Sequence, residues 1–343
     1  TNYISLLKKS LLTAGYNDIP VISISFGGGT INDQPGFKIS WLKIYKPLIT
    51  GIIYGDCISQ LYYATRPRET ETGAADKLKQ KYIQSGILAM KNNDARQFLT
   101  LAEKAASEFR QIRKNIEIQQ IGIVGEIFVK YNSFGHKNVI NWLIEQGVEP
   151  VLPPFSDFFT AAFPNIEARI RGNISKRTTP KIFSTLAEYY IYRIIRKMES
   201  KVSAFPGYRT IDNPHKDALQ ASRIININTQ FGEGWSIPAQ FAKYAETGIN
   251  SVISLQPFGC IANQIISKGI EKRVRQLFPS LNILFLDFDS GTSEANIYNR
   301  LHFMLKSENP LPNSPNQFIK TSALHHVNSA FKNASSITIS SHS

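Results

Sequence analysis

A cysteine and several carboxylate and amide side chains stand directly after predicted strands of this chain. Cys260, in the motif QPFGC, follows the apolar segment Val252–Gln256. A cysteine at the carboxyl end of a strand and near a helix start is expected to have a stabilised thiolate. Such a thiolate suits a nucleophile or an iron ligand. Spacing alone favours a structural packing role for Cys260, with ligation as the alternative, and Cys57, among apolar neighbours in a predicted helix, is interpreted as a packing residue.

Five polar residues are further candidates for the wall of a binding pocket. In a parallel α/β sheet, ligands bind outside the carboxyl ends of the strands, so the segments that follow strands matter most. These segments are Gly125–Gly135, Pro153–Phe159, Thr229–Trp235, Gln256–Cys260 and Asp287–Glu294. The candidates are Glu126, Gln230, Glu233 and Gln256, within these segments, and Asn263, three residues after the fourth of them. Because turns need Gly and Asn for conformational reasons as well, their clustering follows from topology and is no proof of a site.

Other motifs give weaker signals. FGGGT lacks the Lys-Ser/Thr pair of a phosphate-binding loop and is read as a turn. Ser293 and Glu294, in DSGTSE, are typical of a capped helix start, which also offers backbone N–H groups to an anion. The sequence has no recognisable Ser-His-Asp arrangement and no HExxH motif.

The elements that position these residues alternate between strand and helix from Ile118 onwards. The expected strands are Ile118–Phe128, Glu149–Pro154, Arg223–Asn228, Asn250–Leu255 and Asn282–Phe288. The expected helices are Asn138–Gly147, Ile237–Gly248, Asn263–Phe278 and Ser293–Ser307, with a long helical insertion at about 157–222. This alternation predicts parallel pairing with right-handed crossovers, hence a doubly wound, flavodoxin-like α/β lobe.

The rest of the chain divides into three parts around that lobe. Residues 1–65, with a strand at Pro20–Ser25 and a helix over Ile39–Tyr63, are expected to be the end of a preceding α/β lobe. Residues 66–116 have apolar side chains at three- and four-residue spacing and predict a helical connector. The C-terminal lobe spans 117–307. Residues 308–343, rich in Asn, Ser and Pro, predict a disordered tail.

Composition limits the function classes. The 343 residues carry a net charge of +13, and two distant cysteines do not form a secreted disulfide framework. A reducing, cytoplasmic location is the simplest expectation, and no run reaches the ~20 apolar residues of a membrane span. The positive charge gathers on predicted helices, where a solvated face is the plain interpretation. No nucleic-acid-binding motif supports DNA or RNA as a partner.

Several long motifs, in a fixed order, resemble one protein family. IGIVGEIFVKYNSFGHKNVINWLIEQGVEPVLPPFSDFF, TQFGEGW, SLQPFGCIANQIISKGI and LDFDSGTSEANIYNRLHFML resemble the C-terminal part of large activase-type proteins related to 2-hydroxyacyl-CoA (2-hydroxyglutaryl-CoA) dehydratases. PVISISF, QPGFKIS and YGDCISQLYYATRPRETETGAADKL resemble the segment that precedes it. The resemblance covers roughly Ile19–Leu305, and no single short motif carries it.

The resemblance implies an iron–sulfur protein of anaerobic metabolism. In such proteins an ATP-hydrolysing activase domain or subunit drives one electron into a dehydratase-like portion, which removes water from a 2-hydroxyacyl-CoA by radical chemistry. The implied partners are that activase, a second dehydratase-like lobe or subunit, and an acyl-CoA. The implied cofactor is a [4Fe–4S] or related cluster, for which Cys260 matches a cysteine ligand position.

The chain also departs from the family pattern. One cysteine cannot hold a cluster, so the remaining ligands are expected outside this chain. The family motif LPNH stands here as IANQ, with Gln264 in place of a histidine, which puts any role of that histidine in doubt. The start at Thr1 and the unusual tail fit a fragment or a degraded copy, inactive by itself, and a remnant α/β binding module without a cluster is the alternative.

Overall fold

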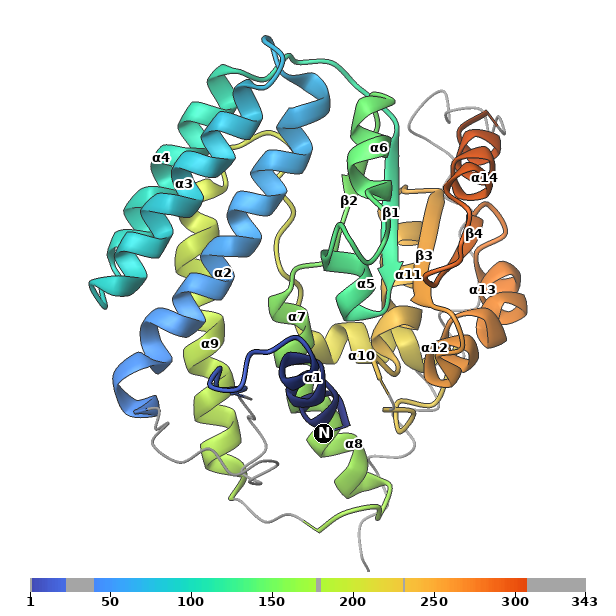
Figure 1. Cartoon of the computed structure of the whole chain (residues 1–343). Helices are drawn as coiled ribbons and strands as arrows, with labels where there is room; N and C mark the ends of the chain where they lie inside the picture. Colours follow the sequence, from blue (N-terminus) through green and yellow to red (C-terminus); the bar gives the residue numbers. More distant parts are fainter. Residues whose placement is uncertain (1, 23–39, 177–179, 231, 307–343) are drawn as a thin grey trace, which may run out of the picture. The chain divides into compact units, whose positions relative to one another are not determined.

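The computed structural model describes residues 2–22, 40–176, 180–230 and 232–306 (Figure 1). The strands are β1 (Gln120–Gly125), β2 (Glu149–Val151), β3 (Ser251–Pro257) and β4 (Asn282–Phe288). The helices before β3 are α1 (Asn2–Thr13), α2 (Trp41–Thr65), α3 (Ala74–Lys91), α4 (Gln97–Gln111), α5 (Ile127–Tyr131), α6 (Val139–Glu145), α7 (Ser156–Thr160), α8 (Ala162–Arg171), α9 (Lys181–Val202), α10 (Pro214–Ser222) and α11 (Ser236–Glu246). Those after β3 are α12 (Ile261–Ile266), α13 (Glu271–Leu277) and α14 (Glu294–Lys306), and the 3₁₀ turns are Arg66–Arg68 and Lys268–Ile270.

The sheet is parallel throughout, with strand order β2-β1-β3-β4. The chain moves from β1 outward to β2, then returns to place β3 on the other side of β1. This is the beginning of a flavodoxin-like order, so the predicted doubly wound α/β class is confirmed. β1 and β3 lie in the centre, and Ile121 is paired with Ser251 and Gly125 with Leu255.

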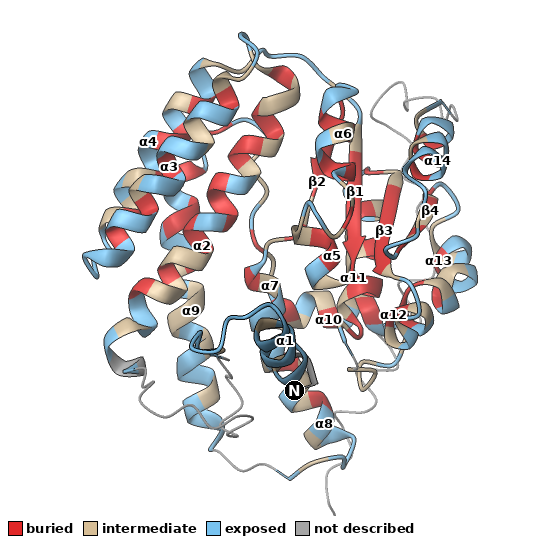
Figure 2. Cartoon of the chain, in the orientation of Figure 1, coloured by how far each residue is buried: buried red, intermediate tan, exposed pale blue. Residues whose placement is uncertain are grey.

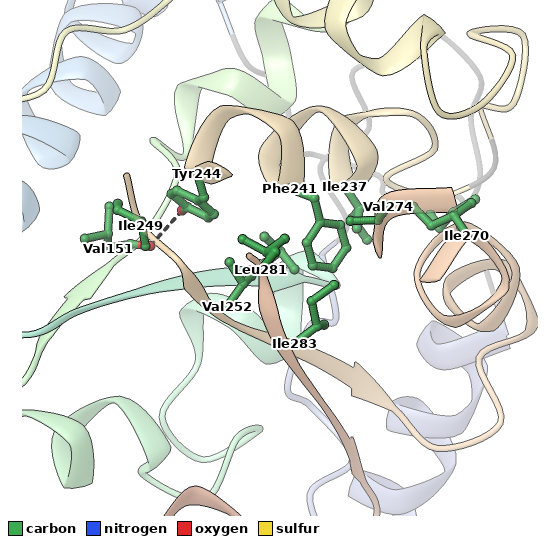
Figure 3. Packing of buried hydrophobic residues seen from close by; sticks show 12 residues of the cluster. Val151, Ile237, Phe241, Tyr244, Ile249, Val252, Ile270, Val274, Leu281 and Ile283 are labelled. Atoms are coloured by element: carbon green, nitrogen blue, oxygen red, sulfur yellow. Dashed lines mark hydrogen bonds between the residues drawn. The ribbon is translucent and has the colours of Figure 1, made fainter. Parts of the chain in front are cut away.

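Both faces of the sheet are covered. On one face, Val124, Val252 and Ile283 pack with Phe241 of α11 and Val274 of α13 (Figure 3). Ile123, Ile253 and Leu255 alternate to the opposite face and are also fully buried. The burial pattern in Figure 2 follows this arrangement, with the central strands buried along their length. Near-continuous apolar strands are what a sheet covered on both faces requires.

Tyr244 fixes α11 against the central strands. Its hydroxyl donates to the carbonyl of Val151 at 2.7 Å (Figure 3) and also reaches that of Ile123 at 3.3 Å. Its ring lies over Gly122, where an added Cβ would stand 2.5 Å from the ring carbon Cδ2. A glycine in β1 therefore gives the aromatic ring the space to approach the sheet.

Four helices, α2, α3, α4 and α9, pack side by side into a helical layer (Figure 1). Its interior is aromatic, with the rings of Tyr54 and Phe98 centred 5.2 Å apart. Cys57 of α2 is fully buried there, and its Sγ lies 3.3 Å from the hydroxyl of Tyr208. Burial raises the pKa of this thiol to about 12, so Cys57 stays protonated. It is a packing residue, as the sequence predicts.

Helices that are neighbours in the sequence do not all pack in the same part of the structure. The stretch 66–116 is helical as predicted, but it packs together with α2 into the helical layer. The predicted insertion at 157–222 is helical too, and it is divided. Its long helix α9 joins the helical layer, whereas α10 packs on α8 and α11 near the sheet. The domain boundaries at 65, 116 and 307 stay predictions.

The predicted strand Arg223–Asn228 is wrong. These residues form turns in which the backbone N–H of Ile225 donates to Ala221 O and the side chain of Asn226 accepts from Asn228 N. Ile224 and Ile225 still pack against the buried cluster of α11 and the sheet. A short apolar run gives the same burial signal in a strand and in a turn, and asparagine side chains that bond to their own backbone compete with a sheet ladder.

The N-terminal part of the chain has less regular structure than predicted. Residues 2–13 form the helix α1, and the helix predicted over Ile39–Tyr63 corresponds to α2. A strand was predicted at Pro20–Ser25. Residues 20–22 do not form a strand, and residues 23–25 lie outside the described residues. The predicted disordered tail also lies outside them.

Candidate functional site

The carboxyl ends of β1 and β3 form the point at which the connections of the sheet reverse direction. The two strands are adjacent, and the backbone N–H of Glu126 donates to Leu255 O at 2.9 Å. In open α/β sheets a crevice forms there, because the following loops diverge to opposite faces. Glu126 and Cys260 follow these two strands, and Gln256 is the penultimate residue of β3. The structure therefore brings three of the sequence candidates to one edge.

Glu126 and Glu233 both bind the first turn of α5. Glu126 is the residue before this helix, and its Oε2 accepts from Val129 N at 2.8 Å. The Oε1 of Glu233 accepts from Ile127 N at 2.7 Å. Two carboxylates thus satisfy helix N–H groups that have no partner within the helix. Both carboxylates therefore use hydrogen bonds to hold the start of α5. Only Glu233 keeps a buried oxygen, Oε2, without a hydrogen-bond partner among the described residues.

Lys130 is a buried residue of α5 on which the charges of the two carboxylates act, and it was not identified from the sequence. Its side chain is 4 % exposed, and burial lowers its pKa to about 8, while the charges of Glu233, Asp157 and Glu126 act in the opposite direction. Burial also raises the pKa of Glu233. A single sequence gives no sign that a lysine on a short helix is buried and interacts with glutamates from two separate segments.

Gln256 and Asn263 are buried amides with unused hydrogen-bonding groups. Gln256 is fully buried, its Nε2 donates to Asp287 Oδ1 at 2.9 Å, and its Oε1 has no partner in the described part of the chain. Asn263 of α12 is 1 % exposed, and neither side-chain atom is hydrogen-bonded to a described residue. A Cβ at Gly232 would stand 3.6 Å from Asn263 Oδ1, so the segment after α10 passes beside this amide. A buried amide without partners costs stability, typically ~1–3 kcal/mol per group.

Asp287, at the end of β4, is the centre of the polar network on the same edge. It accepts from Gln256 and Gln264, and its Oδ2 pairs with Lys268 Nζ. The amide Nε2 of Gln264 donates to Asp287 Oδ1 at 3.1 Å, and this contact fixes the start of α12 against β4. An aspartate near the end of an otherwise apolar strand is the signal that identifies this residue in the sequence.

Cys260 is the half-exposed thiol of this edge. It precedes α12, and its backbone N–H donates to Pro257 O at 3.2 Å. Three apolar side chains close to it in the sequence are exposed to solvent: Phe258 (69 %), Ile261 (76 %) and Ile265 (58 %). Within the described residues no group of three or more His, Cys, Asp or Glu side chains is arranged to hold a metal. The donor set fits one ligand of an iron–sulfur cluster and does not fit a complete cluster.

Gln230 does not join these residues. Its Nε2 donates to the carbonyls of Asn165, on α8, and Ile227. The amide therefore braces its own loop against α8 instead of facing the β1–β3 edge. Of the six candidates, Glu126 and Glu233 meet at α5, Cys260 and Asn263 lie at the start of α12, Gln256 bonds to Asp287 of β4, and Gln230 stands apart.

A cavity of about 450 Å³ lies beyond the carboxyl end of β2 and is separate from Cys260. The face of α2 forms one wall, the segment Pro153–Asp157 a second, and α10 and α11 a third. Asp56 of α2 crosses to this segment, where its carboxylate accepts from the backbone N–H groups of Phe155 and Ser156 at 2.7 and 3.0 Å. That contact joins the helical layer to the sheet.

The loop that follows α5 contains a histidine whose titration affects stability. His136 is 3 % exposed, its Nδ1 has no hydrogen-bond partner among the described residues, and burial lowers its pKa from 6.5 to about 4. The unfolded chain therefore binds a proton at a pH where the folded chain does not. We expect the free energy of unfolding to fall by up to about 3 kcal/mol as pH decreases from 6.5 to 4.

The measurement is urea denaturation at half-unit pH steps, comparing the wild type with His136→Gln. The variant is expected to show a shallower slope over the interval from pH 6.5 to 4. Equal slopes in the two proteins would assign the acid sensitivity to other groups.

No helix in the described parts of the chain is both long and apolar enough to cross a membrane. Comparisons with protein-family models, with curated proteins and with solved structures found no match.

Proposed function

We propose that this chain is part of an iron–sulfur protein of the 2-hydroxyacyl-CoA dehydratase and activase type, acting in ATP-driven low-potential electron transfer or reductive radical dehydration. The observation that carries the proposal is the position of Cys260. A half-exposed thiol stands at the reversal point of a parallel sheet, where ligands of this fold class bind. The motif around it is the one that resembles the family.

The chain contributes one ligand in this proposal. Iron–sulfur clusters are held by cysteine thiolates, and Cys57 is unsuited because it is fully buried and hydrogen-bonded to Tyr208 within the helical layer. Cys260 is the remaining thiol. When bound, the cluster supplies single-electron transfer. The residues of this chain position Cys260 through β3 and through the contacts of α12 with β4, formed by Gln264 and Asp287.

A second protein surface completes the site in this proposal. Phe258, Ile261 and Ile265, all within five residues of Cys260, expose apolar side chains to solvent. Exposed apolar area of this kind is typical of a surface covered by another domain. The proposed partner is the second dehydratase-like lobe or subunit, and an activase that hydrolyses ATP delivers the electron. An acyl-CoA is the proposed substrate class of the whole assembly.

The test is anaerobic reconstitution, with ferrous iron and sulfide, of the full-length protein of which this chain is the proposed part, followed by measurement of iron content and of visible absorbance. We expect the wild type and Cys57→Ala to gain iron with thiolate-to-iron charge-transfer bands. Cys260→Ala is expected to lose most of both signals. Unchanged iron content in Cys260→Ala would refute the assignment, and circular dichroism of each variant excludes unfolding as the cause.

The alternative function is an α/β binding module without a cluster. The unpartnered amide of Asn263 favours it, because a buried amide with two unused groups is suited to a small polar ligand. In the same experiment this alternative predicts that the wild type gains no more iron than Cys260→Ala. More iron in the wild type than in Cys260→Ala supports the cluster protein, and equal iron in both supports the binding module.

A further inference from the structure

The cavity between α2 and the helices near the sheet has the size and lining of a small-molecule site. Its volume of about 450 Å³ falls within the ~300–1,000 Å³ typical of ligand pockets. Gly55 and Ser59 of α2 line it and are solvent-exposed, so the cavity opens to solvent along that helix. Trp235 contributes a buried aromatic wall. This site is remote in sequence from Cys260 and does not depend on the proposed iron site.

Two carboxylates of the cavity wall have unused hydrogen-bonding capacity. Asp157 on α7 and Asp217 on α10 both line the cavity, and neither carboxylate accepts a hydrogen bond from a described residue. Asp56, in contrast, is fully used as a cap for α7. Gln240 lines the same cavity and has a buried Oε1 without a partner among the described residues. Three acceptors therefore face the cavity without donors.

The lysine nearest to these carboxylates is already engaged. Lys243 Nζ pairs with Asp212 Oδ2 at 2.9 Å, and its charge also acts on Asp157 and Asp217. Lys216 adds a second contact to Asp212, at 3.7 Å. Three carboxylates, Asp157, Asp212 and Asp217, thus share two ammonium groups. The negative charge of Asp56 also raises the pKa of Asp157, and the positive charge of Lys130 lowers it. The three carboxylates and the two ammonium groups keep an excess of one negative charge when all carboxyls are ionised. The wall also contains Lys79, whose ammonium lies over the ring of Tyr62, and Arg209, which is paired with Glu149.

We propose that this cavity is a binding site for a small organic cation, an amine or a guanidinium, which donates hydrogen bonds to Asp157 and Asp217. A charge-assisted hydrogen bond to a carboxylate is the strong kind, and the low dielectric of the cavity strengthens it. Gln240 Oε1 accepts a further hydrogen bond from the ligand. A cation also relieves the mutual repulsion of the carboxylates.

Binding depends on pH in a defined direction. Burial, which outweighs the attraction of Lys243, raises the pKa of Asp157 to about 7 and that of Asp217 to about 6. An alkylamine stays protonated in this range. The affinity for the cation therefore increases as pH rises from 5.5 to 8, because the carboxyls ionise.

The experiment is calorimetric titration of the full chain with 1,4-diaminobutane, and with butan-1-ol as the neutral analogue. We expect saturable binding of the diamine, no binding of the alcohol, and tighter binding at pH 8 than at pH 5.5. Asp157→Asn and Asp217→Asn are each expected to weaken binding about tenfold or more, the value of one lost charge-assisted contact. Neither variant removes a cap or an ion pair, so both are expected to fold.

Three further variants make the result decisive. Gly55→Leu places a side chain in open space at the cavity mouth, where no atom lies within 4 Å of an added Cβ, and it is expected to abolish binding without lowering the melting temperature. Asp18→Asn, at an exposed position, and Cys260→Ala are expected to bind as the wild type does. Absence of saturable binding in the wild type, equal binding of the alcohol, or unchanged binding in Asp157→Asn and Asp217→Asn would each overturn the proposal.

Discussion

Replacing Glu149 by alanine is expected to lower the free energy of unfolding by about 3–5 kcal/mol. Glu149 stands at the start of β2, and its Oε2 pairs with Arg68 Nη1 at 2.7 Å, both side chains being 4 % exposed. Its Oε1 accepts from Arg209 at 3.0 Å, and Gln120 donates to Oε2. Burial would raise the pKa of Glu149, but these donors lower it below its ordinary value. Removal of the carboxylate leaves the buried guanidinium of Arg68 without its anion.

The control and the pH dependence follow from the same contacts. Glu117→Ala, at an exposed position, is expected to change stability by less than about 0.5 kcal/mol in the same urea titrations. Since the folded pKa of Glu149 lies below the unfolded one, its contribution is present above pH 4.5 and is lost on acidification. A loss under 1 kcal/mol for Glu149→Ala, on the scale of an exposed pair, would contradict the role given to this network.

The second large effect is expected at Gly125, the last residue of β1. Its φ of +125° is unfavourable for other residues, and an added Cβ would stand 1.9 Å from Leu255 O in β3. Gly125→Ala must therefore push the two central strands apart and break the bond from Glu126 N to Leu255 O. We expect a loss on the order of 4 kcal/mol or more, or failure to fold.

Gly147→Ala is the matched control for the backbone conformation alone. Gly147 has a φ of +77° after α6, and nothing lies within 4 Å of an added Cβ. The cost there is the left-handed conformation of alanine, about 1–2 kcal/mol. Thermal unfolding compares the two variants, and amide hydrogen exchange of β1 and β3 locates the damage. Equal melting temperatures for Gly125→Ala and Gly147→Ala would mean that the close approach of the two strands costs nothing.

The sequence was sufficient to predict the parallel sheet because its strands are apolar runs followed by turns and amphipathic helices. It failed at Arg223–Asn228, where isoleucines are partly buried in a turn, since burial alone does not distinguish the two conformations. Gly125 shows a similar limit. The sequence places a glycine after a strand, but the closeness of Leu255 O depends on a partner strand 130 residues later.

The candidate site was predicted in part, for the same physical reason. Residues that follow central strands necessarily reach one edge, so Glu126, Gln256 and Cys260 could be identified from topology. Which of them has free hydrogen-bonding groups could not, because Glu126 is used as a helix cap and Gln230 turns to α8. The cavity that contains Asp157 and Asp217 was missed, since α2, α7, α10 and α11 meet only in the folded chain.

The two edges of the sheet differ in their ability to accept another strand. β2 has three residues, one of them Pro150, and α2 packs against it, so this edge has few donors and is covered. β4 has seven residues, and no described strand pairs with its outer side. Any fifth strand, whether from this chain or from another, therefore has to pair with β4. The sheet can grow in one direction only, away from the helical layer.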